Sequence, residues 1–215
     1  SLMRIPNHIG IIPDGNRRRD AARGLSKEMG YKEGLAPGLR ILELCKEVGV
    51  KEVTYYGFTV DNTKRPAKQK KAFIQACIEA IELIANHDVS LRVIGNTDSK
   101  VFPASLLPYT RRTNIGKGGI KVNFLVNYGW EWDLGNLLAN GQKKSKVIQA
   151  LKSSDVSRVD LLIRWGGRRR LSGFLPAQCA YADIYVIDDY WPDFKDQHFY
   201  DALNWYAQQD ITLGG

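Results

Sequence analysis

The chain has 215 residues, of which 44% are hydrophobic and 25% are charged, with a formal net charge of +8. This balance is that of a globular chain with one sizeable core, so we expect a single domain over residues 3–215. No apolar run approaches the roughly 20 residues of a membrane-spanning helix, and the N-terminus lacks the apolar core of a signal peptide, which favours a cytoplasmic protein. Ser1 and Leu2 precede Met3, and we expect them to be left over from expression.

The positive charge by itself admits three kinds of polyanionic partner: nucleic acid, an anionic membrane surface or a phosphorylated small molecule. The position of the positive charge distinguishes among these partners. Arginines are grouped at 17–19 and at 168–170, and each group follows a glycine-containing turn at the end of an apolar run. This arrangement favours a diphosphate site. The cysteines at 45, 77 and 179 stand singly in apolar surroundings, which indicates core positions rather than disulfides or a metal site.

Apolar runs of strand length alternate with amphipathic stretches of helical length, which is typical of an α/β fold with a mostly parallel central sheet flanked by helices. In chain order, we expect a strand at 8–12, a helix at 34–47, a strand at 52–58, a helix at 68–86, strands at 90–94 and 121–126, a helix at 134–151, strands at 160–163 and 184–186, and a helix at 196–208. The glycine-rich stretch 116–119 precedes a strand rather than a helix, so we interpret it as a hairpin-like turn and not as a phosphate loop.

The first chemistry-bearing motif, Pro-Asp-Gly-Asn-Arg-Arg at 13–18, directly follows the first expected strand. In parallel sheets, ligands bind beyond the carboxyl ends of the strands. An aspartate there can bind a hard cation, backbone N–H groups can face phosphate oxygens, and arginines can grip those oxygens through two hydrogen bonds. The alternative interpretation is a helix cap with a solvated basic turn.

Two further motifs follow expected strands. Asn62 and Arg65 come after the strand at 52–58 and could contact a phosphorylated substrate, although the segment needs no function as a turn and helix start. At 164–173, four arginines and a serine surround a double glycine after the strand at 160–163. So much like charge beside a core requires a counter-anion, and this segment is therefore the strongest indication of an anion site.

These three motifs, in this order and spacing, resemble those of the cis-prenyltransferase (undecaprenyl diphosphate synthase-like) family. Three more segments agree: Val-Ile-Gly-Asn at 93–96, Asn-Tyr-Gly at 127–129 and Tyr-Trp-Pro-Asp-Phe at 190–194. The match covers nearly the whole chain. It implies a prenyltransferase that forms homodimers or heteromers, with a hydrophobic tunnel along the apolar side of the helix at 68–86, although the same apolar residues would also read as ordinary core.

By the same resemblance, Asp14 holds Mg²⁺ and helps the allylic diphosphate leave, and Asn62 assists proton removal from the acceptor. The resemblance implies an allylic diphosphate site made of Gly15, Asn16, Arg17, Arg18, Lys27, Tyr31 and Arg65. It implies that Arg164, Arg170 and Ser172 bind the diphosphate of the acceptor, isopentenyl diphosphate. Asp183 stands at the position of a metal-binding glutamate, one methylene shorter, and is the second expected metal ligand.

The chain departs from the family pattern mostly on the acceptor side. Trp165 replaces threonine, Arg168 replaces glutamate, and Thr63 replaces tryptophan beside Asn62, while 212–214 lacks the Arg-x-Gly of many members. We therefore expect a relaxed acceptor site that gives short, irregular or O-prenylated products, and transient membrane contact through the lipid product. One alternative is a non-catalytic partner subunit of a heteromeric enzyme. The other is a nucleic-acid-binding protein, which the absence of a nucleic-acid motif disfavours.

Overall fold

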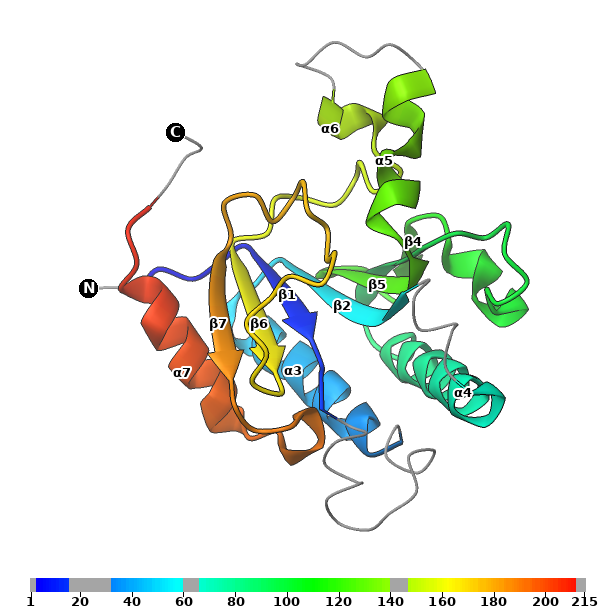
Figure 1. The fold of residues 1–215 in the computed structure, drawn as a ribbon. Coiled ribbons are helices and arrows are strands. Elements are labelled where there is room, and N and C mark those ends of the chain that lie inside the picture. Colours follow the sequence, from blue (N-terminus) through cyan, green and yellow to red (C-terminus); the bar gives the residue numbers. More distant parts are fainter. Residues whose placement is uncertain (1–2, 16–31, 60–65, 140–146, 212–215) are drawn as a thin grey trace.

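A sheet of seven strands forms the centre of the computed structural model, which describes residues 3–15, 32–59, 66–139 and 147–211 (Figure 1). The strand order is β4-β3-β5-β2-β1-β6-β7, and every neighbouring pair is parallel except β3 and β4. The strands are β1 (His8–Ile12), β2 (Glu52–Thr59), β3 (Val89–Ile94), β4 (Thr113–Ile115), β5 (Lys121–Tyr128), β6 (Leu161–Trp165) and β7 (Asp183–Ile187). The expected α/β class with a mostly parallel sheet is confirmed.

The α-helices in the described part of the chain are α3 (Leu35–Val48), α4 (Ala67–Ile84), α5 (Trp130–Ala139), α6 (Val147–Ala150) and α7 (Asp196–Ala207). Short 3-10 helices cover Lys32–Gly34, Ala104–Tyr109 and Trp191–Asp193. Within the described ranges, no helix is both long and apolar enough to cross a membrane.

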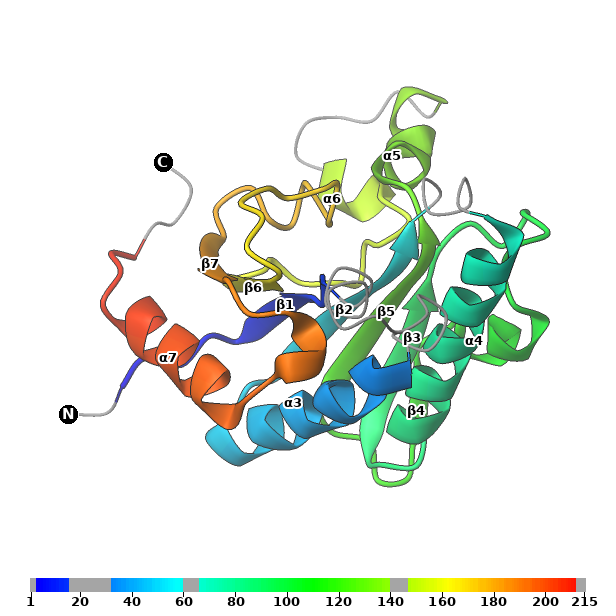
Figure 2. The same cartoon turned by 60° about the horizontal axis from the view of Figure 1, so that its bottom comes forward.

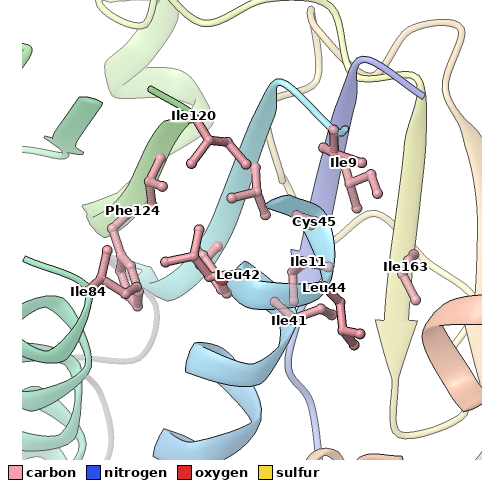
Figure 3. Packing of buried hydrophobic residues seen from close by; sticks show 14 of the residues in the cluster. Ile9, Ile11, Ile41, Leu42, Leu44, Cys45, Ile84, Ile120, Phe124 and Ile163 are labelled. Carbon is pink, nitrogen blue, oxygen red and sulfur yellow. The ribbon is translucent and has the colours of Figure 1, made fainter. Parts of the chain in front are cut away.

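One face of the sheet packs against α3, α4 and α7; in Figure 2, α3 and α7 lie below the sheet and α4 lies to its right. Apolar residues three to four apart give α3 an inward stripe that includes Ile41, Leu42 and Cys45, all of them almost completely buried. Figure 3 shows this stripe lying over Ile11 of β1 and beside Ile84 of α4. The main hydrophobic core therefore lies between the sheet and these helices.

The opposite face of the sheet is covered by α5, α6 and the loop between β6 and β7. A second hydrophobic cluster forms there around Tyr56, Leu162 and Phe174. Phe174 packs directly on β1 because residue 10 is glycine: a Cβ at Gly10 would lie 2.7 Å from a ring carbon of Phe174. This contact anchors the arginine-rich loop that follows β6 to the middle of the sheet.

Most expected elements agree with the structure to within about two residues, but two interpretations were wrong and one short strand was not expected. The single helix expected at 134–151 is instead two helices, α5 and α6, and α5 begins four residues earlier. The stretch 116–119 does not close a hairpin, because β4 and β5 pair with opposite edges of β3. The three-residue strand β4 was not expected at all, since so short an edge strand leaves almost no periodicity in the sequence.

The strand order places a topological switch at β1. Strand β2 pairs with one edge of β1, and β6, much later in the chain, pairs with the other edge of β1. In open α/β sheets, ligands bind beyond the carboxyl ends of the strands at such a switch. The carboxyl ends of β1 and β6 carry Asp14 and Arg164, so the fold brings the first and third sequence motifs to one place.

Candidate active site at the carboxyl ends of β1 and β6

The centre of the candidate site is an ion pair between adjacent strands. Ile12 of β1 lies opposite Arg164 of β6, and Nη2 of Arg164 donates to Oδ2 of Asp14 at 3.2 Å. The Arg164 side chain is 6% exposed and that of Asp14 is 26% exposed. Asp14 therefore lies at the mouth of the site, where a ligand can reach it, with a buried guanidinium behind it.

Arg164 also holds the loop that follows its own strand. Its Nη1 donates to the carbonyl oxygen of Arg170 at 2.5 Å and to Oγ of Ser172 at 2.8 Å. One guanidinium thus connects Asp14 to the loop that carries two of the three expected acceptor-binding residues. The buried Nε–H of Arg164 has no acceptor among the described residues, and a buried donor without a partner costs about 1–3 kcal/mol.

The conformation of this loop is fixed from the second core cluster. Ser172 has a left-handed backbone with φ of 51°, and its carbonyl oxygen accepts a hydrogen bond of 2.7 Å from the Tyr56 hydroxyl. The rings of Tyr56 and Phe174 meet edge to face at 5.2 Å. Tyr56 was not among the expected site residues, because its polar contact comes from the fold and its place in a buried strand marks it only as core.

A third segment, at 190–194, holds the backbone of Asp14. The N–H of Trp191 donates to the carbonyl oxygen of Asp14 at 3.1 Å. Gly15 is buried with φ of 111°, and a Cβ there would lie 2.7 Å from the ring of Tyr190 and 3.1 Å from its Cα. Glycine is therefore required at position 15 for two reasons, the backbone conformation and the close approach of Tyr190.

Beside Asp14, an apolar cleft opens between α3, α4 and the sheet, with about 370 Å³ of empty space that is partly open to solvent. Its lining residues are Pro13, Gly34, Leu35, Gly38, Leu39, Tyr55, Ala80, Leu83, Ile84, Phe124 and Trp191. Pro13 and Trp191 connect the cleft to the Asp14 turn. From α4, Ala80, Leu83 and Ile84 line this cleft, and the tunnel expected along the apolar side of the helix at 68–86 stays a prediction. A polar site at the end of an apolar cleft can hold a molecule with an anionic head and a hydrocarbon tail.

Comparisons with known proteins identify the family. A family model described as "Putative undecaprenyl diphosphate synthase" matches residues 12–214. The chain belongs to this prenyltransferase family. The ditrans,polycis-undecaprenyl-diphosphate synthase of Pectobacterium atrosepticum is 34% identical over 98% of the chain and 90% of that relative, and the one of Escherichia coli is 32% identical over 97% and 89%. An isoprenyl transferase of Leptospira interrogans is 33% identical over 98% and 95%.

A solved structure supports the fold assignment. Lavandulyl diphosphate synthase from Lavandula x intermedia, in complex with dimethylallyl diphosphate, superposes with a TM-score of 0.84 over 97% of this chain and 98% of that chain, at 20% sequence identity. The similarity in fold therefore extends over nearly the whole cis-prenyltransferase domain.

The structure corrects the interpretation of Trp165. This residue follows Arg164 in β6, and successive side chains of a strand point to opposite faces of the sheet. Trp165 is fully buried against Trp191, with ring centroids 4.8 Å apart, and its Nε1–H donates to Nδ1 of His198 in α7 at 3.2 Å. It therefore does not line the acceptor side of this cis-prenyltransferase, and it braces the sheet against α7 instead.

Trp165→Phe tests this correction. We expect the free energy of unfolding to fall by about 1–3 kcal/mol, because the variant loses buried area and the hydrogen bond to His198. The Michaelis constants and the choice of acceptor should stay within about twofold, since the Trp165 side chain points away from Arg164 and phenylalanine keeps a ring against Trp191. Urea unfolding and steady-state kinetics measure the two effects, and a changed acceptor preference with unchanged stability would contradict the correction.

Asp183 and Asp14 are not brought together within one chain. Asp183 lies at the amino end of β7, opposite Leu161, whereas Asp14 follows the carboxyl end of β1. Asp183 pairs with Leu161, which is three residues before Arg164, so along the strand direction Asp183 lies about 10 Å from Arg164. Partial burial raises the pKa of Asp183, while Arg4 opposes this shift. A metal-binding role of Asp183 remains a prediction, and the geometry does not support one ion shared with Asp14 inside a single chain.

The remaining expected residues divide into two groups. Arg168 and Arg170 have exposed side chains in the loop after β6, next to Ser172. The allylic-site and catalytic residues that lie outside the described residues are Asn16, Arg17, Arg18, Lys27, Tyr31, Asn62 and Arg65. Among the described residues, no group of three or more His, Cys, Asp or Glu side chains could hold a metal ion.

Proposed function

We propose that the protein is a Mg²⁺-dependent cis-prenyltransferase that transfers an allylic prenyl group from its diphosphate to isopentenyl diphosphate. The observation that carries the proposal is the Arg164 fork, which joins Asp14 to Arg170 and Ser172. Two diphosphates bound on either side of this fork would lie next to one another, as the transfer requires. The names of the bacterial relatives, undecaprenyl-diphosphate synthases specific for farnesyl diphosphate, support the same substrate classes.

In the proposed reaction, the carbon–oxygen bond of the allylic diphosphate breaks, and diphosphate leaves with the bonding electrons. The double bond of isopentenyl diphosphate forms the new carbon–carbon bond, and a proton is lost from the acceptor. Arg164, Arg170 and Ser172 would bind the acceptor diphosphate and fix its orientation, because charged and hydroxyl donors grip phosphate oxygens strongly. Gly15 and the neighbouring allylic-site residues would bind the leaving diphosphate.

Asp14 fits the proposed metal. Mg²⁺ is commonly held by one or two carboxylates together with water and substrate phosphates, and Asp14 offers a partly exposed carboxylate at the mouth of the site. When bound, the ion would supply positive charge that stabilises the departing diphosphate. Arg164 would keep the carboxylate oriented toward the mouth.

The acceptor range is a subsidiary proposal. Of the substitutions that suggest a relaxed acceptor site, Trp165 is buried on the face of the sheet that packs against α7, away from the site. Position 63 and the segment 212–214 lie outside the described residues. Arg168 remains, with an exposed guanidinium in the acceptor loop. An added cation there favours acceptors that carry a phosphate or diphosphate group over uncharged alcohols.

We also propose a homodimer. On the face opposite α3, α4 and α7, Ile184 lies in register with Leu162 in the exposed edge strand β7. Trp130, Ile148 and Tyr181 are also large exposed apolar residues. Their segments, α5, α6 and the loop between β6 and β7, cover this face of the sheet. Exposed apolar residues on one face commonly mark an interface. Sedimentation that finds only monomers at micromolar concentration would contradict this part of the proposal.

A product assay tests the reaction. Purified full-length protein is incubated with Mg²⁺, labelled isopentenyl diphosphate and allylic diphosphates of several lengths, and parallel reactions contain simple alcohols or a chelator. We expect prenyl diphosphates longer than the starter, with formation that stops when Mg²⁺ is removed. Absence of any product, together with turnover after a second polypeptide is added, would instead support the non-catalytic partner subunit.

A further inference from the structure

The side chain of Trp130 lies beside the acceptor loop. Trp130 is the first residue of α5, which begins two residues after the carboxyl end of β5. A Cβ at Gly173 would lie 3.2 Å from Cδ1 of the Trp130 indole and 3.7 Å from the Tyr56 hydroxyl oxygen. Glycine at position 173, with φ of 77°, therefore leaves the space beside the loop that the indole occupies.

The first turn of α5 holds Trp130 in this place. Asp133, about one turn further along the helix, is 2% exposed. Its carboxylate accepts hydrogen bonds from the Tyr128 hydroxyl at 2.7 Å and from the Ser153 hydroxyl at 2.6 Å. The start of the helix is therefore tied both to β5 and to the chain that follows α6, and this fixes the position from which the Trp130 side chain extends.

Trp130 and the neighbouring tryptophan of α5 have different surroundings. Trp132 packs against the second hydrophobic cluster, and its ring meets that of Tyr128 edge to face at 6.2 Å. Trp132 therefore joins α5 to the core. Trp130 is instead 46% exposed and presents an apolar surface beside Ser172 and Gly173. An apolar surface next to a loop that can bind phosphate is suited to the hydrocarbon part of a ligand.

We propose that Trp130 forms the apolar wall of the acceptor site and contacts the five-carbon group of isopentenyl diphosphate. This inference rests on the proposed function, in which Arg164, Arg170 and Ser172 bind the acceptor diphosphate, and it adds a residue that determines acceptor specificity. Ser172 and Gly173 are neighbours in the chain, with Cα atoms about 3.8 Å apart. A diphosphate held at Ser172 therefore brings the first carbon atoms of its ester group within reach of the indole.

The physical basis is that the two halves of the acceptor are bound by different interactions. Charged and hydroxyl donors bind the diphosphate, whatever group is attached to it. The indole removes part of the hydrocarbon from water, and about 50 Å² of apolar surface buried against it tightens binding by about tenfold. Trp130 should therefore favour diphosphates with a five-carbon group over diphosphates with a shorter group, and loss of the ring should remove most of this preference.

The test compares two unreactive acceptor analogues, isopentyl diphosphate and methyl diphosphate, which share the diphosphate and differ in the hydrocarbon. The inhibition constant of each against isopentenyl diphosphate is measured with the full-length protein, Mg²⁺ and a saturating allylic diphosphate. Trp130→Ala and the conservative Trp130→Phe are compared with the unchanged protein. Ile148→Ala is the matched control, because Ile148 is 48% exposed and belongs to α6, which covers the same face of the sheet. Sedimentation measures the oligomeric state of each variant.

We expect Trp130→Ala to raise the inhibition constant of isopentyl diphosphate by about tenfold and that of methyl diphosphate by less than about twofold. Trp130→Phe should restore most of the difference, and Ile148→Ala should change neither constant. Equal weakening of both analogues would make Trp130 a support of the loop, unchanged constants would separate it from the acceptor, and loss of a dimer together with activity would assign it to a subunit contact. Each of these three results would overturn the inference and leave the proposed function standing. No turnover by the unchanged protein would overturn both.

Discussion

Asp14→Asn should reduce prenyl transfer by at least about a thousandfold while the protein stays folded, because the charge that a metal provides to a leaving group is worth several kcal/mol. Asparagine keeps the size of the side chain and can still accept the hydrogen bond from Arg164. We therefore expect the free energy of unfolding to fall by only about 1–2 kcal/mol. Initial rates at saturating substrates and urea unfolding measure the two quantities.

Asp188→Asn is the matched control for Asp14→Asn. Asp188 also follows a strand at the carboxyl edge of the sheet, but its carboxylate is exposed and, among the described residues, its ion pair is a surface one with Arg169 at 3.8 Å. Exposed pairs of this kind contribute about 0–1 kcal/mol, so the control should leave turnover and stability nearly unchanged. Comparable turnover in the two variants would argue against a catalytic role of Asp14.

Arg164→Lys should raise the Michaelis constant for isopentenyl diphosphate by about a hundredfold, with a smaller effect on the allylic substrate. A lysine ammonium cannot reproduce the guanidinium fork, which contacts Asp14, the Arg170 carbonyl and Ser172 at once. The acceptor loop would lose part of its support, and we expect the free energy of unfolding to fall by about 2–4 kcal/mol. Titration of each substrate at a saturating level of the other separates the two constants.

The control for this substitution lies in the same loop. Arg169→Lys changes an exposed guanidinium whose contacts in the described part of the chain are the surface pair with Asp188 and a weak contact with the Gly167 carbonyl oxygen. It should shift stability by less than about 0.5 kcal/mol. If Arg164→Lys raises both Michaelis constants equally, or neither, then Arg164 is a structural brace and not part of the acceptor site.

Two segments far apart in the chain hold Asp14 in place. Its side chain is held by β6 through Arg164, and its backbone is held by the segment at 190–194 through the Trp191 N–H. The same segment packs Tyr190 against Gly15 and Trp191 against Trp165. The resemblance motif at 190–194 therefore has a physical role here, which is to fix the turn that presents Asp14.

Two other resemblance motifs also maintain the fold. A Cβ at Gly95 would lie 1.5 Å from the carbonyl oxygen of Val126, so only glycine allows β3 and β5 to approach at this point. Asn127 has a left-handed backbone with φ of 52°, and its Nδ2 donates to the Asn96 carbonyl oxygen at 3.0 Å. These contacts keep the carboxyl ends of the two strands together without touching the Asp14 site.

The sequence by itself determined most of the local structure, and it predicted the chemical character of the site. Apolar runs bounded by turn residues predicted β1, β2, β5 and β6 to within about two residues, because long buried strands have a strong pattern. It also indicated an anion site in the loop after β6, since four arginines near a core need a counter-anion. The opposite directions of Arg164 and Trp165 could have been predicted as well, because alternation along a strand requires them.

Only the tertiary structure decided which distant residues meet. Asp14 and Arg164 are 150 residues apart, and no periodicity in the sequence predicts that β6 pairs with β1. The same holds for the stacking of Tyr55 on Phe124. It also holds for Asp183, which lies at the amino end of its strand, away from Asp14. Local patterns reflect burial and backbone preference within a few residues, whereas strand order and register depend on packing between segments far apart in the chain.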